Sequence, residues 1–310
     1  MGRVFLFATF SGFIIGAGAP RVLADNNLLY PVADTTLQEV VPDNNNGGMT
    51  WFNCGVTLNG TRNRGLVKFD IAGNVPAGSR ITDGYLQVSV LQGSVDAGPN
   101  SEFLDLHRVL RDWGEGTNTT PSTSNGNRGT PATVGEATWN DRFALTTNHW
   151  GAPGAEAEID YLTDVSAEQV IYNVAQSPFF FSSTPQFLAD LQLWLDHPQA
   201  NFGWILIPTD ETTAGTARRF GSREGDPDLA PQLFVVYTPP IGRVEAVGNQ
   251  FRLHFTAQAG QAYEVDYASN LNDGAVWQTL TNVPAPMDTT NVVVTDTIGG
   301  QQRFYRLKPD

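Results

Sequence analysis

The chain has 310 residues, a net charge of −14 at neutral pH and one cysteine. The acidic excess argues against nucleic acid or an anionic membrane as a partner, because no basic stripe offsets the repulsion. A single cysteine excludes an internal disulfide, so packing alone must stabilise the core.

Residues 1–24 have the features of a secretory signal peptide. Arg3 precedes an apolar run that extends to about Ala19, and residues 22–24 offer modest side chains for cleavage before Asp25. Polar residues and glycines interrupt the run, and it is shorter than the roughly 20 apolar residues that a bilayer span needs. We therefore expect cleavage, a secreted or periplasmic location and no membrane insertion afterwards. Removing the two arginines of this segment moves the net charge from −14 to −16.

Short runs with period-two alternation follow from Asp34 to Tyr237, separated by Gly, Pro, Asn and Asp. This pattern is typical of antiparallel strands and turns. In residues 64–71, Val67, Phe69 and Ile71 share one face, and we expect the other face, with Leu66, to be wetter. Residues 81–91 repeat the arrangement. Residues 202–207 and 233–237 are apolar on both faces, as in central strands of a two-sheet sandwich.

One helix is predicted among the strands. Thr184 is a candidate N-cap, Pro185 suits the first turn, and Pro198 ends the segment. Five apolar residues fall on a single stripe, which indicates packing against the core: Phe187, Leu188, Leu191, Trp194 and Leu195.

A long segment between Trp113 and about Ile159 is rich in Gly, Thr, Asn and Ser and shows little periodicity. Loops of this length inside a compact domain are usually functional or poorly ordered. We expect part of it to be ordered around its tryptophans.

A domain boundary is predicted at residues 237–240, where two prolines stop sheet pairing after a strong strand. Residues 241–310 contain further short alternating runs, which predict a small, fibronectin-like β-sandwich. The sequence thus predicts an all-β protein: a jelly-roll-like sandwich with one helix over residues 25–240, then the smaller sandwich.

Several motifs of residues 33–240 carry a family resemblance. They are Ala33-Asp-Thr-Thr-Leu37, residues 44–48, Gly65-Leu-Val-Lys-Phe-Asp70, residues 106–116, Ala137-Thr-Trp139, residues 188–196, Asn201-Phe-Gly-Trp204, Arg219-Phe-Gly-Ser-Arg-Glu224 and Tyr237-Thr-Pro-Pro240. Through them the region resembles the DNRLRE-type domains, secreted bacterial β-sandwiches that include the family 96 carbohydrate-binding modules. The resemblance implies a jelly-roll sandwich and, in some members, polysaccharide binding.

The C-terminal region resembles a small β domain appended to many exported proteins of planctomycete- and verrucomicrobium-like bacteria. This resemblance rests on residues 255–261, Tyr263-Glu-Val-Asp-Tyr267 and Arg303-Phe-Tyr-Arg306.

Sugar recognition needs flat apolar rings that stack on pyranose faces, with polar groups nearby that bond hydroxyls. The long segment and its neighbouring strand offer both, and the candidates are His107, Trp113, Glu115, Trp139, Arg142 and Trp150. The alternative is that the tryptophans close the end of the sandwich.

Arg218, Arg219, Arg223 and Glu224 form the densest charge group of the chain. Guanidinium groups bind carboxylates in a bidentate way, so Arg219, Arg223 and Glu224 are candidates for binding an acidic polysaccharide. The alternative is an internal ion pair with Glu224 or a nearby aspartate.

Structural calcium is a second possibility, because Asp34, Asn44 and Asn46, with Asp43 and Asn45, offer hard oxygen ligands. No other cofactor is required. Asn and Asp clusters also form plain turns.

No HExxH, GxSxG, Walker, Rossmann or CxxC motif is present. The leading hypothesis is a secreted, non-catalytic protein that binds a polysaccharide or cell-surface glycan. The alternatives are a polysaccharide lyase or hydrolase that uses a carboxylate pair, such as Asp112 with Glu115 or Glu224 with Asp226, and a structural matrix or envelope protein.

Overall fold

The computed structural model describes residues 24–93, 102–120, 128–238, 241–257, 259–270, 276–288, 290–297 and 303–309. The chain divides into two compact units, and the larger comprises Leu28–Ile71 and Asp83–Val235. The predicted signal peptide, except Ala24, lies outside the described residues, as do Pro239 and Pro240 of the predicted boundary.

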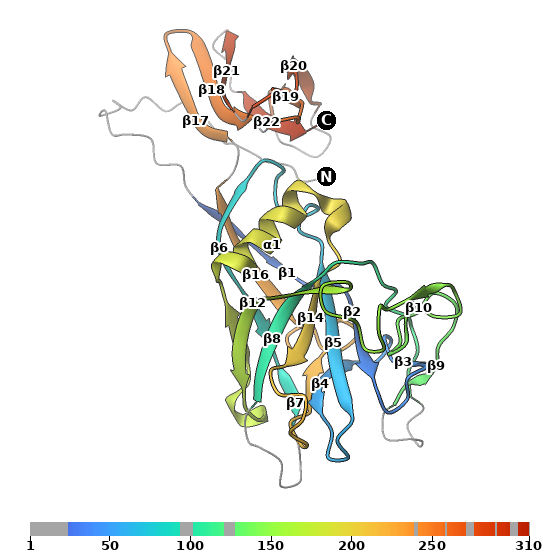
Figure 1. Ribbon diagram of the computed structural model, residues 1–310. Coiled ribbons are helices and arrows are strands. Elements are labelled where there is room, and N and C mark those ends of the chain that lie inside the picture. Colours follow the sequence, from blue (N-terminus) through green and yellow to red (C-terminus); the bar gives the residue numbers. More distant parts are fainter. Residues whose placement is uncertain are drawn as a thin grey trace. The chain divides into compact units, whose positions relative to one another are not determined.

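The larger unit is built on an eight-stranded antiparallel sheet (Figure 1). Its strands follow the order β12-β8-β14-β5-β4-β15-β7, and β2 pairs with β5. Their bounds are β2 Pro31–Gln38, β4 Trp51–Val56, β5 Arg62–Phe69, β7 Val90–Gln92, β8 Glu102–Val109, β12 Tyr161–Ile171, β14 Trp204–Pro208 and β15 Arg218–Gly221.

A second sheet has the strand order β1-β16-β6-β13. The bounds are β1 Asp25–Leu29, β6 Arg80–Val88, β13 Phe179–Ser182 and β16 Gln232–Thr238. Alternate side chains of three of these strands are buried in pairs: Leu86 and Val88, Phe179 and Phe181, Leu233 and Val235. One face of this sheet therefore belongs to the core. The all-β sandwich with one helix that the sequence predicts is confirmed.

The predicted helix is α1, Pro185–Asp196. The Oγ1 atom of Thr184 accepts a hydrogen bond from the backbone N–H of Phe187, which caps the first turn. The apolar stripe of α1 packs on Trp204 of β14. The ring centroids of Phe187 and Trp194 lie 4.9 and 4.6 Å from the ring centroid of Trp204. Two short 3₁₀ turns, Val174–Gln176 and Pro198–Ala200, lie on either side of α1 in the chain.

The long segment is ordered where the structure describes it, at residues 110–120 and 128–160, and we call this part the cap segment. Its regular structure is limited to two short strand pairs: β3 Asn44–Asn45 with β9 Thr130–Pro131, and β10 Asp141–Phe143 with β11 Asn148–His149. The cap segment forms a second hydrophobic cluster with the large sheet, made of Leu37, Leu66, Val109, Trp113, Ala137, Trp139, Trp150, Ala155, Ile205 and Ile207.

This second cluster explains why the large sheet is apolar on both faces. Val67, Phe69 and Ile71 are buried on one face, as predicted. Leu66, expected on a wetter face, is also fully buried, because the cap segment covers that face. Period-two alternation marks which side chains share a face, and not whether a distant segment covers it.

The smaller unit contains two three-stranded sheets, β17-β18-β21 and β20-β19-β22. The bounds are β17 Ile241–Val247, β18 Gln250–Ala257, β19 Tyr263–Ala268, β20 Gln278–Val283, β21 Thr290–Thr297 and β22 Phe304–Pro309. Their buried cluster includes Phe251, Leu253 and Phe255 with Tyr263 and Tyr305.

Candidate functional site

The three tryptophans predicted to stack on a sugar lie in the second hydrophobic cluster. Trp113, Trp139 and Trp150 are all buried. The indole N–H of Trp113 donates to the carbonyl of Phe202, and that of Trp150 to the carbonyl of Thr138. Their rings therefore pack the cap segment onto the sheet and present no face to a ligand in this structure.

Arg142 and His107, two further candidates, are also buried and bonded to backbone carbonyls. The guanidinium of Arg142 donates to the carbonyls of Asp112 and His149. Nδ1 of His107 lies 2.9 Å from the carbonyl oxygen of Leu162, and burial lowers the pKa of this imidazole. Both side chains hold neighbouring segments of the cap and β12 in place.

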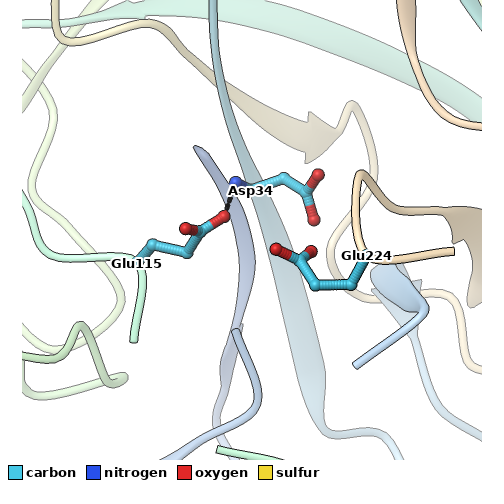
Figure 2. A group of neighbouring side chains, drawn as sticks. All are labelled: Asp34, Glu115 and Glu224. Carbon is cyan, nitrogen blue, oxygen red and sulfur yellow. Dashed lines mark hydrogen bonds between the residues drawn. The ribbon is translucent and has the colours of Figure 1, made fainter. Parts of the chain in front are cut away.

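Four predicted residues meet in one cluster, which we call the acid–arginine cluster: Asp34, Glu115, Arg223 and Glu224. Asp34 comes from β2, Glu115 from the cap segment, and the other two follow β15. Figure 2 shows the three carboxylates, and each has an oxygen within 4.8 Å of the other two. Segments far apart in the sequence are thus joined by charged side chains.

Arg223 is the centre of this cluster. Its guanidinium contacts Glu115 through two hydrogen bonds of 2.7 and 2.9 Å, and Nε lies 2.9 Å from Oε1 of Glu224. Its backbone N–H donates to Oδ2 of Asp34 at 2.9 Å, and the backbone N–H of Asp34 donates to Oε1 of Glu115. The alternative of an internal Arg223–Glu224 pair is therefore what the structure contains.

Burial raises the pKa of two carboxyl groups of the cluster. It raises the pKa of Asp34 to about 7, against the hydrogen bonds from Arg223 and Ser222, and the charges of Glu224 and Glu115 add to the rise. Burial also raises the pKa of Glu115, whereas Glu115 raises that of Arg223. Three carboxylates of this kind have the oxygen chemistry that Ca²⁺ prefers. Arg223 already supplies one positive charge to them.

The side-chain amides of Asn44 and Asn46, the other predicted metal ligands, form hydrogen bonds outside the acid–arginine cluster. Nδ2 of Asn44 donates to the carbonyl of Arg128. Oδ1 of Asn46 accepts from Oγ1 of Thr35 and from the backbone N–H of Thr36. The structure thus brings Asp34 together with Glu115 and Glu224, and gives Asn44 and Asn46 roles in turns and strand contacts.

The remaining arginines of the charge group point in different directions. Arg218 is buried and donates to the backbone carbonyls of Tyr172, Thr216 and Ala217. Arg219, its neighbour on β15, is half-buried and stacks on Trp51, with Cζ 4.3 Å from the ring centroid. Of the predicted arginines, Arg219 is therefore the one placed on the outer side of a strand next to an aromatic ring.

Aromatic side chains that the sequence analysis did not propose as ligand contacts gather on the outer face of the second sheet. They are Phe180 of β13, Tyr85 of β6 and Phe234 of β16, three adjacent strands, and we call them the aromatic platform. The Phe180 and Tyr85 ring centroids are 5.5 Å apart in an edge-to-face contact. Those of Tyr85 and Phe234 are 5.1 Å apart and stacked.

The platform is partly open to solvent although its rings touch. Phe180 is 42% exposed, while Tyr85 and Phe234 are half-buried. The Gln87 side chain lies on the same face of β6 as Tyr85, and its amide contacts that of Gln232 on β16. The signal in the sequence was the alternation itself: in Phe179-Phe-Phe181 the middle ring must point away from the core.

No family model matches the chain, and a search of curated proteins found no match.

Proposed function

We propose that the larger unit is a non-catalytic binding module for a polysaccharide, and that the aromatic platform is its binding surface. The observation that carries the proposal is the row formed by Phe180, Tyr85 and Phe234 across three adjacent strands. The resemblance of residues 33–240 to DNRLRE-type domains, some of which bind polysaccharides, points the same way.

The chemistry of the platform suits a sugar chain. Partly exposed rings in mutual contact form an apolar surface on which pyranose faces can stack, and apolar patches on a soluble protein often mark binding sites. The amides of Gln87 and Gln232 beside them can donate to and accept from hydroxyl groups. A row of rings across three adjacent strands fits an extended polymer better than a small enclosed ligand.

Two of the carboxylates predicted for an enzyme, Glu115 and Glu224, are already paired with an arginine. Glycoside hydrolysis needs two carboxyl groups that flank the scissile bond. Glu115 and Glu224 are held by Arg223, and Asp34 beside them is 1% exposed. The acid–arginine cluster therefore favours a structural role, in which it fixes the cap segment to β2 and to the residues after β15.

Export, which residues 1–24 predict, would bring the protein to extracellular or cell-surface polysaccharides. Among the described residues, no helix is long and apolar enough to cross a membrane.

The proposal is tested by affinity electrophoresis of the protein in gels that contain neutral or acidic polysaccharides. Each polysaccharide is tested once with calcium and once with a chelator. We expect at least one polysaccharide to retard the folded protein. Dependence on calcium would assign a cation to the carboxylates of the acid–arginine cluster. Absence of retardation by every polymer would contradict the proposal, and release of reducing or unsaturated ends would replace it with an enzymatic function.

A further inference from the structure

A small pocket lies at β4, β15 and β7, strands of the large sheet of the larger unit, and at the residues that follow β4 and precede β15. Its volume is about 200 Å³. Its lining includes Asn53, Gln92, Arg218 and Arg219. The pocket is below the roughly 300–1,000 Å³ that encloses a drug-sized ligand, so it suits a single sugar unit or a comparable group.

Strand register places the polar side chains of this pocket side by side. Arg219 of β15 pairs with Asn53 of β4 on one side and with Gln92 of β7 on the other. Trp51 lies two residues before Asn53 and therefore shares its face of β4. A guanidinium, two amides and an indole thus occupy one face of three adjacent strands.

Two donors, one that lines this pocket and one beside it, have no acceptor in the described part of the chain. They are Nε of Arg219 and Nε1 of Trp51, and both atoms are buried. Buried donors normally find an acceptor, since an unmet one costs about 1–3 kcal/mol. Arg218 and Arg223 conform to this rule through carbonyls and carboxylates. Nε of Arg219 does not conform, and it has almost no exposed surface, so a ligand in the pocket would meet the remainder of this half-buried side chain.

Charge points to the kind of acceptor. No carboxylate of the described residues forms an ion pair with Arg219, in a chain that carries a net charge of −14. Desolvation lowers the pKa of Arg219, but an arginine stays protonated in proteins. An unpaired guanidinium beside an aromatic ring is complementary to an anion with a planar, two-oxygen head group.

We infer that this pocket binds the carboxylate of a uronic-acid unit through Arg219, with Asn53 and Gln92 contacting the sugar and Trp51 stacked on the guanidinium. The guanidinium donates to both carboxylate oxygens, and the amides bond the ring hydroxyls. The polysaccharide bound by the protein is then an acidic one. The conclusion that the polysaccharide is acidic rests on the proposed function. The binding of a single carboxylate in the pocket does not require the aromatic platform.

The test uses the monosaccharides galacturonate and galactose, which differ at the carboxylate. The protein has seven tryptophans, so its indole N–H signals form a small set in a ¹H–¹⁵N NMR spectrum. The Trp51 signal is assigned with Trp51→Phe. Galacturonate is expected to shift that signal in a saturable way, and galactose at the same concentrations is not. A shift of equal size with galactose, or galacturonate shifts confined to other tryptophans, would overturn the inference.

Variants separate the guanidinium from general charge. Arg219→Gln is expected to weaken galacturonate binding by about tenfold or more, as loss of a hydrogen bond to a charged group does. Arg219→Lys keeps the charge, loses the planar fork, and should bind at an intermediate level. The control Arg80→Gln removes the same charge from an exposed position and should bind normally.

Three results would overturn the assignment: normal binding by Arg219→Gln that is folded by circular dichroism, equal weakening by Arg80→Gln, or tighter binding of galactose 6-sulfate than of galacturonate. Failure here is distinguishable from failure of the proposed function. The monosaccharide titration reports on the pocket alone, and the change in polymer retardation caused by Phe180→Ala reports on the aromatic platform.

Discussion

Asp34 shows how burial sets the chemistry of one side chain. Its pKa rises from 3.8 to about 7 in the folded protein, chiefly because the carboxyl is removed from water. Between these values the native state keeps a proton that the unfolded chain has released. The stabilising contribution of this group is therefore complete below about pH 4 and is lost as the pH rises to about 7.

Asp34→Asn removes this titration and keeps an oxygen that can accept from the backbone N–H of Arg223. Relative to the wild type, the variant should gain free energy of unfolding between pH 4.5 and pH 8, by an amount on the order of 2–4 kcal/mol. Urea denaturation of both proteins at the two pH values measures the difference. Asp228→Asn, at an exposed position after β15, serves as the control. Parallel pH dependence in the wild type and Asp34→Asn would show that the carboxyl is ionised in both states.

At the scale of elements, the cap segment depends on close packing rather than on regular secondary structure. Gly154 has a φ of +89°, and a Cβ atom there would lie 2.5 Å from Cζ2 of Trp139. Its backbone N–H also donates to the carbonyl of Trp139. Only glycine allows this approach, because any side chain would enter the indole ring and adopt a disfavoured backbone conformation.

Gly154→Ala should therefore destabilise the larger unit beyond the conformational cost alone. The control is Gly60→Ala, where φ is +76° and an added Cβ atom would meet no atom within 4 Å beyond its chain neighbours. We expect a loss of about 1–2 kcal/mol for Gly60→Ala from backbone strain, and roughly 3 kcal/mol or more for Gly154→Ala. Chemical denaturation followed by tryptophan fluorescence measures both. Equal losses would mean that the cap segment yields to the added methyl group.

At the scale of the whole molecule, local patterns predicted the elements better than the site. Thr184, Pro185 and Pro198 defined α1, and alternation predicted the buried rows of β5 and β6, because these signals lie within a few neighbouring residues. The burial of Trp113 could not be predicted in the same way. It depends on the contact of the cap segment with the large sheet, which links residues distant in the sequence.

The candidate site shows the same difference between what neighbouring residues indicate and what only contacts between distant segments reveal. The acid–arginine cluster contains Asp34, Glu115, Arg223 and Glu224, residues chosen from their chemistry, but only the fold shows that they bind one another. The aromatic platform combines rings from three strands, and sheet order rather than chain order makes them neighbours. Alternation along a strand indicates the outward position of each ring and leaves the order of the strands open.

The most direct test of polysaccharide binding by the aromatic platform compares two phenylalanine substitutions. Phe180 of the platform and Phe103 of β8 are similarly open to solvent, at 42% and 47% exposed. With a polysaccharide that retards the wild type in affinity electrophoresis, Phe180→Ala should weaken binding by about tenfold or more, since truncation of an aromatic contact within a binding site can cost roughly 2 kcal/mol or more. Phe103→Ala should bind as the wild type does. Unchanged binding by a folded Phe180→Ala, or an equal loss in both variants, would contradict the account.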